Sequence, residues 1–99
     1  MNAASPVLLS LYIAGTTPMS ARAVVNVRKL CDTHLAGRYL LRVIDLVNDP
    51  DKARAAQIIA LPTLIKLQPR PERRFIGDVS DPARVLHALG LNAVGQEVP

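Results

Sequence analysis

Short aliphatic runs alternate with stretches of helical spacing along much of this chain. The first run, from Val7 to Ala14, ends before Gly15, and its length is typical of a strand buried on both faces. Thr17 then fits an N-cap, and Pro18 fits the first position of a helix. Apolar residues recur from there at the spacing of one helix face as far as Leu35. The pattern predicts a strand followed by a long amphipathic helix.

The rest of the pattern predicts shorter elements. We expect strands over Tyr39 to Val47, Thr63 to Leu67 and Arg73 to Ile76, and helices over Pro50 to Ile59 and Ala83 to Leu89. The proline-rich turn 68–72 makes the last two strands an antiparallel hairpin. The predicted order, βαβαββα, is an α/β fold that resembles the thioredoxin plan. We expect one domain over residues 1–99, with a core of about 7–91 and a loose tail over 92–99.

The composition predicts an aliphatic core and no disulfide chemistry. Hydrophobic residues make up 49% of the chain and aromatic residues only 3%. The single cysteine, Cys31, excludes a disulfide within the chain, a cysteine-based zinc site and a two-thiol redox motif. The start has no secretory signal pattern, and no apolar run approaches the ~20 residues of a membrane helix. We therefore expect a cytoplasmic protein that makes no use of a membrane.

The basic balance does not by itself predict a nucleic-acid partner. The net charge is +4, from 12 Lys and Arg against 8 Asp and Glu. These basic residues are scattered along the chain, apart from a local cluster of Arg70, Arg73 and Arg74. Only Phe75 and two tyrosines are available to stack on bases, so the pattern of a single-strand binder is largely missing. We expect no nucleic-acid partner.

The stretch Gly15 to Ser20 is where thioredoxin-like proteins carry their reactive Cys-x-x-Cys, because a helix N-terminus stabilises a thiolate there. Here the stretch contains no cysteine, and Ser20 has no His or Lys beside it in sequence. Cys31 follows more than three turns later on the apolar face, as a buried structural thiol would. His34 and His87 are far apart in sequence. We expect no enzyme activity, no cofactor and no metal site.

Pro62, in the sequence Leu61-Pro62-Thr63, stands where thioredoxin-like proteins have a cis-proline before the third strand. In that plan, the backbone beside the proline pairs with an extended partner peptide. The alternative is an ordinary trans-proline that ends the preceding helix. Pro62 is therefore a candidate for a structural cis-proline.

The segments, taken in order, resemble the KaiB family of clock proteins over about residues 7–90. The stretches that carry the resemblance are Leu11 to Pro18, Ser20 to Ala23, Val43 to Asp45, Ile58 to Leu64 and Arg73 to Asp78. The specific signal is the combination of an A-G-x-T-P loop, a V-I-D strand end and R-R-x-I-G-D.

The resemblance implies a non-catalytic regulator that binds a KaiC-like ATPase and modulates its clock or timer cycle. A KaiA-like protein or a histidine kinase is a further partner that it implies. The family is also metamorphic, so the alternative fold is a βαββααβ ground state assembled as a tetramer, and a homo-oligomer (dimer or tetramer) is possible. Two alternative functions remain open: a thioredoxin-like sensor or adaptor that acts on a histidine kinase, and a divergent stress-response protein.

Three departures from the family pattern bear on that implication. Ala88, Leu89 and Gly90 replace a Gly-x-Asp sequence, and alanine favours helix over glycine by up to ~1 kcal/mol. Gln57 replaces a common lysine, and the tail 92–99 has one acidic residue where clock members have an acidic tail. We therefore expect a thioredoxin-like resting state in a divergent homologue.

Five residues are candidates for partner binding: Arg22, Gln57, Ile58, Leu61 and Arg74. The arginines match positions of the family pattern, and solvated surface arginine is the alternative for both. The other three residues flank Pro62 and offer an apolar docking surface, for which core packing is the alternative, favoured at Ile58.

Overall fold

The computed structural model describes residues 6–91, so the predicted tail over 92–99 lies outside the described residues. The elements are β1 (Val7–Ile13), α1 (Pro18–His34), β2 (Tyr39–Asp45), α2 (Asp51–Ala55), β3 (Thr63–Gln68), β4 (Arg73–Ile76) and α3 (Pro82–Ala88). This βαβαββα order confirms the thioredoxin-like prediction, and the alternative βαββααβ order is not the one observed. None of the helices within residues 6–91 has both the length and the apolar character to cross a membrane.

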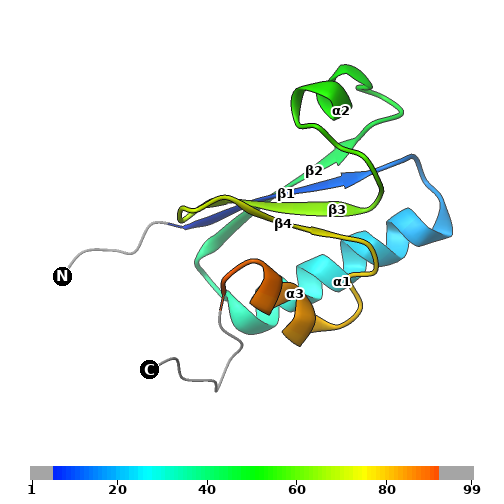
Figure 1. Cartoon of the computed structure of the whole chain (residues 1–99). Coiled ribbons are helices and arrows are strands. Elements are labelled where there is room, and N and C mark those ends of the chain that lie inside the picture. Colours follow the sequence, from blue (N-terminus) through cyan, green and yellow to red (C-terminus); the bar gives the residue numbers. More distant parts are fainter. Residues whose placement is uncertain (1–5, 92–99) are drawn as a thin grey trace.

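The four strands form one sheet in the order β2-β1-β3-β4. β1 runs parallel to β2 and antiparallel to β3, and β4 is antiparallel to β3, as the hairpin rule predicts. α1 and α3 lie together on one face of this sheet, and α2 lies beyond the other (Figure 1). The sheet therefore separates two unequal layers.

The larger layer holds the main hydrophobic core. Alternate residues of β1 point into it, because successive side chains of a strand face opposite sides. They meet the apolar face of α1 and the inner face of α3. The buried members are Val7, Leu9, Leu11, Ile13, Ala23, Val27, Leu30, Cys31, Leu35, Leu64, Val79, Val85, Leu86 and Leu89. This core is aliphatic, as the composition predicts.

A smaller cluster covers the opposite face of the sheet. Tyr12, Ile44 and Ile65 are buried in it, one from each of three adjacent strands. Partly buried Ile58 and Leu61, from the segment between α2 and β3, pack over them. The segment that contains Pro62 is therefore attached to the sheet by apolar contacts.

The prediction of a helix over Pro50 to Ile59 is wrong at its end, because α2 stops at Ala55. Gln57 adopts a left-handed conformation with φ of 56°, which ends the right-handed helix. The N–H of Ile58 then bonds the carbonyl of Ala53, and that of Gln57 bonds the carbonyl of Arg54. This is a Schellman ending with glutamine at the position that glycine usually occupies, so the sequence carries no signal for it.

α3 ends in the same way, but with glycine in the left-handed position. Gly90 has φ of +73°, and its N–H bonds the carbonyl of His87. The N–H of Leu91 bonds the carbonyl of Leu86, which completes the motif. Gly90 is therefore required by the backbone at the end of α3.

Candidate functional site

Hydrogen bonds around Thr17 and Ser20 hold the start of α1. Thr17 is the N-cap, as predicted: its Oγ1 accepts from the N–H of Ser20 at 3.1 Å, and its hydroxyl donates to Oγ of Ser20 at 3.0 Å. Ser20 is buried, and its own hydroxyl donates to the carbonyl of Ala14 at 3.1 Å. The hydroxyl proton of Ser20 is thus donated to the backbone, so these hydrogen bonds fix the conformation of the turn and do not activate the serine as a nucleophile.

Asp45 connects the ends of the two parallel strands. Its Oδ1 accepts from the N–H of Gly15 at 2.8 Å and from the N–H of Val47 at 2.9 Å. One carboxylate therefore holds the loop after β1 and the turn after β2, which places the start of α1 beside the sheet. This geometry gives a physical reason for the aspartate that ends the V-I-D strand.

Cys31 lies in the main core and is completely buried. Burial, followed by the neighbouring charge of Asp32, raises the pKa of its thiol to about 12. The thiol is neutral at physiological pH and out of reach of solvent, as predicted from its place on the apolar face of the helix.

Native protein is therefore expected to react with a small disulfide reagent at pH 8 far more slowly than denatured protein. The higher pKa alone lowers the thiolate fraction by a factor on the order of a thousand, and burial adds to this. The measurement is the rate of release of a coloured thiol from the reagent, with and without denaturant. Equal rates in the two states would contradict the burial of Cys31, and Cys31→Ala is the blank.

A groove lies between the N-terminal half of α1 and the Leu61–Pro62 segment, and we name it the Pro62 groove. Its cavity has a volume of about 440 Å³. The lining residues include Met19, Arg22, Leu61, Pro62 and Asp78. A second hollow of about 260 Å³ shares Met19, Leu61 and Pro62 with it. The Leu61–Pro62 peptide bond is cis, as are the bonds before Pro69 and Pro71.

The Pro62 groove combines apolar surface with one cation and one anion. Met19 is 59% exposed, Arg22 is exposed, and Leu61 is half-buried. Hydrogen bonds from Ser80, then the charges of Arg22 and Arg84, hold the pKa of Asp78 below its usual range. Such a surface can bind a partner by contact and charge.

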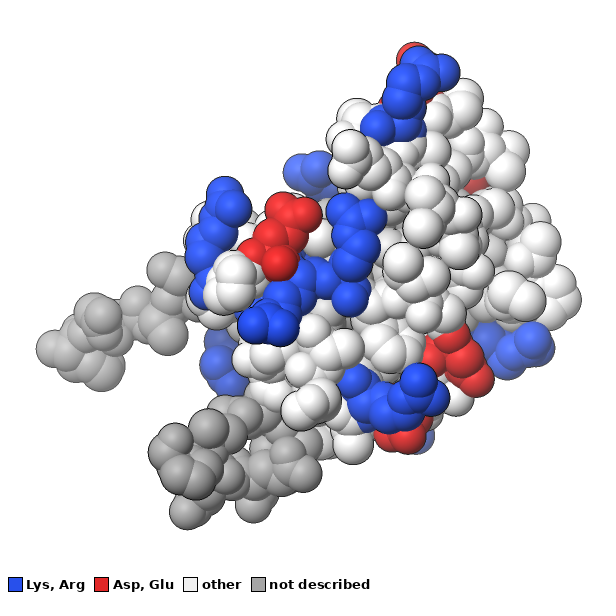
Figure 2. Space-filling view, viewed as in Figure 1, with Lys and Arg blue, Asp and Glu red and all other residues white. Residues whose placement is uncertain are grey.

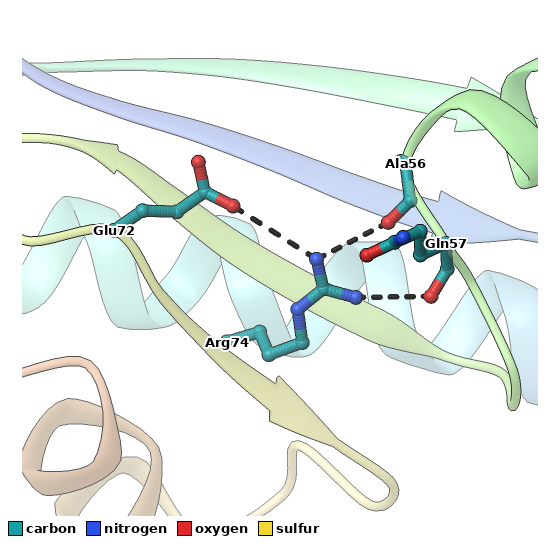
Figure 3. Close-up of polar contacts among 4 residues, drawn as sticks. All are labelled: Ala56, Gln57, Glu72 and Arg74. Atoms are coloured by element: carbon teal, nitrogen blue, oxygen red, sulfur yellow. Dashed lines mark hydrogen bonds and ion pairs between the residues drawn. The ribbon is translucent and has the colours of Figure 1, made fainter.

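Arg74 lies on the other face of the sheet and is engaged within the chain (Figure 3). Its guanidinium donates to the carbonyl of Gln57 at 3.2 Å and to that of Ala56 at 3.1 Å. Glu72 forms an ion pair with the same group at 3.8 Å. Arg74 therefore fastens the left-handed end of α2 to β4, a role that neither of the two sequence interpretations anticipated.

The five predicted partner-binding residues do not form one surface. Arg22 and Leu61 meet at the Pro62 groove, while Gln57, Ile58 and Arg74 lie around the end of α2. Ile58 packs against the smaller cluster, in line with the core interpretation favoured for it. Partner binding by any of these residues stays a prediction.

Sequence reasoning missed two residues of this region. Met19 is a large apolar side chain that is exposed at the second position of α1. The only sequence signal for this exposure is its place directly after Pro18, at the start of the helix. Asp45 appears in the sequence only as the end of a strand, whereas its carboxylate holds the adjoining loop. Among residues 6–91, no three His, Cys, Asp or Glu side chains come together in a way that could hold a metal ion.

Comparison with known proteins identifies the family to which this sequence belongs. A family model described as the KaiB domain matches residues 10–91. The circadian clock oscillator protein KaiB of Prochlorococcus marinus (strain NATL2A) is 45% identical over 91 residues, which cover 92% of this chain and 85% of that protein. The protein of the same name from Parasynechococcus marenigrum (strain WH8102) is 48% identical over 84 residues, covering 85% and 81%.

Solved structures show the same fold at lower identity. The N-terminal domain of Synechococcus elongatus SasA superimposes with a TM-score of 0.72 at 24% identity, over 91% of this chain and 89% of that one. Chloroplastic thioredoxin z superimposes with a TM-score of 0.70 at 19% identity, over 87% and 77%. These likenesses concern the fold, whereas the family model and the curated relatives match the sequence itself. On that evidence, the chain belongs to the KaiB family.

Proposed function

We propose that this protein is a non-catalytic regulator that binds a KaiC-like ATPase and modulates its clock or timer cycle. Relatives at 45–48% identity are named circadian clock oscillator proteins and match most of the chain. A regulator of this kind acts by contact, so it needs an exposed surface and no reactive group.

The Pro62 groove is the observation that carries the proposal. It lies where thioredoxin-like relatives place reactive sulfur, yet it offers an exposed methionine, an arginine and a proline segment. The hydroxyl of Ser20 is engaged with the backbone, and Cys31 lies in the core. These residues support binding of a partner protein at the groove rather than catalysis there.

Arg22→Ala is expected to weaken binding to a KaiC-like ATPase about tenfold, since a charged anchor in a partner interface contributes roughly 1–2 kcal/mol. Met19→Ala should act in the same direction by removing exposed apolar contact. The measurement is biolayer interferometry against the ATPase ring, with ATP, with ADP and without nucleotide.

Arg54→Ala is the matched control, because Arg54 is an arginine of α2 with an 87% exposed side chain and does not line the groove. It should bind as the unaltered protein does. No complex with the ATPase in any nucleotide state would contradict the proposed function. Full affinity of both groove variants would contradict the proposed site alone.

The second candidate is an adaptor that acts on a histidine kinase. The likeness to the N-terminal domain of SasA favours it at the level of the fold. The same measurement with a kinase sensor domain, in place of the ATPase, separates the two candidates. A KaiA-like protein enters the first scheme as an additional component, tested by adding it to the preformed complex.

A further inference from the structure

A buried lysine lies opposite an arginine near the turn between β3 and β4. Lys66 is only 3% exposed, and its cross-strand partner is Arg73. Side chains directly opposite each other share a face of the sheet, and like charges in that position destabilise the pairing. Leu64, two residues earlier on β3, belongs to the main core, so both cations lie on the face that α1 and α3 cover.

The C-terminal turn of α3 brings Gly90 against the same two side chains. A Cβ on residue 90 would lie 3.4 Å from Nε of Arg73 and 3.7 Å from Nζ of Lys66. The positive φ of Gly90 favours glycine, so no side chain fills that position. Two cationic nitrogens therefore border one small space at the end of α3.

No acidic side chain within residues 6–91 balances this pair. The ion pairs of that part of the chain join Lys52 with Asp49, Arg54 with Asp51 and Arg74 with Glu72. Burial, and then the charge of Arg73, lowers the pKa of Lys66 below its ordinary 10.5. Two neighbouring cations repel each other when no counter-charge lies between them, so an anion placed here would gain more than one at a single isolated lysine.

We propose that Lys66, Arg73 and the space beside Gly90 form a binding site for the carboxylate of an aspartate or glutamate side chain. The edge of a guanidinium offers parallel N–H donors to a flat carboxylate, and the ammonium adds a charged donor from the neighbouring strand. Several Lys and Arg side chains lie over this end of the β3–β4 hairpin, with an acidic side chain among them (Figure 2). The site shares none of the lining residues of the Pro62 groove and does not depend on the function proposed above.

The carboxylate has two possible sources with the same chemistry. Glu97 of this chain follows Gly90 by seven positions in sequence. An acidic side chain of another protein, or of a second copy of this chain, would supply the same group. The test therefore needs an arm in which Glu97 is neutral.

The experiment is an NMR titration of the full chain with sodium acetate, at an ionic strength held constant with sodium chloride. The signals followed are the Gly90 amide and the side chain of Lys66, in the unaltered protein and in Glu97→Gln. Saturable shifts are expected in at least one of the two. Lys66→Met and Arg73→Gln, each made in the background that responds, should weaken the response about tenfold or more, and Arg54→Gln should leave it unchanged.

Saturation in the unaltered chain supports the site and assigns it to an external carboxylate. Saturation only in Glu97→Gln supports the site and assigns it to Glu97. The proposal would be overturned if neither protein gave a saturable shift. It would also be overturned if Arg54→Gln weakened the response to acetate as much as Lys66→Met and Arg73→Gln do. Lys66→Met replaces a charge that lies opposite another cation with an apolar chain of similar length and should fold. Arg73→Gln changes an exposed residue and keeps the test decisive if Lys66→Met does not fold.

Discussion

Leu86→Ala is expected to lower the free energy of unfolding by about 2 to 5 kcal/mol. Leu86 is 1% exposed and, with Val85 and Leu89, attaches α3 to the main core. α3 has only seven residues, and a helix of that length has little stability of its own. Truncation of Leu86 therefore removes buried apolar area and also weakens the packing that keeps the helix formed.

The measurement is urea unfolding followed by far-UV circular dichroism, which gives the midpoint and the slope. His87→Ala is the control, because His87 is the neighbouring residue of α3 and is exposed. That variant should stay within about 0.5 kcal/mol of the unaltered protein. A Leu86→Ala variant as stable as the His87→Ala control would mean that α3 does not pack as described.

Asp45→Ala is expected to cost about 1.5 to 3 kcal/mol, the range for loss of hydrogen bonds to a charged acceptor. Its carboxylate accepts from the backbone N–H groups of Gly15 and Val47, which lie at the ends of two different segments. Without it, both donors lose their partner, and the loop that leads into α1 is no longer fastened to the end of β2. If the Pro62 groove binds the ATPase, the same variant should also bind it less tightly.

Asp45→Asn is the matched control, because the amide oxygen still accepts a hydrogen bond while the negative charge is gone. It should fall between the unaltered protein and Asp45→Ala in urea unfolding. Amide exchange at Gly15 gives a local readout, and it should be fastest in the alanine variant. An alanine variant with unchanged stability and unchanged exchange at Gly15 would show that Asp45 does not hold this loop.

Much of the fold was predictable, because its signals are local. The apolar run from Val7, the Thr17 cap and the glycine at position 90 each act on neighbours in sequence, so a local pattern is enough to predict the elements that they begin or end. The end of α2 was not predictable, because Gln57 takes a left-handed conformation that glutamine does not signal. Arg74 shares in holding that conformation from a distant strand.

The candidate site was predictable only in part, for a related reason. The sequence marked Arg22, Leu61 and Pro62, and the fold brings them to one groove. It placed Arg74 in the same group, although this arginine lies on the opposite face of the sheet. Which face a residue occupies depends on strand register, and register is set by partners far along the chain.

The sequence by itself determined the order of the elements, the aliphatic core and the absence of cysteine from the turn before α1. Only the tertiary structure decided that Asp45 fastens that turn, that Arg74 is engaged within the chain, and that Lys66 is buried beside Arg73. The physical reason is distance along the chain. Periodicity and capping act within a few residues, whereas these polar contacts join segments that only the folded sheet brings together.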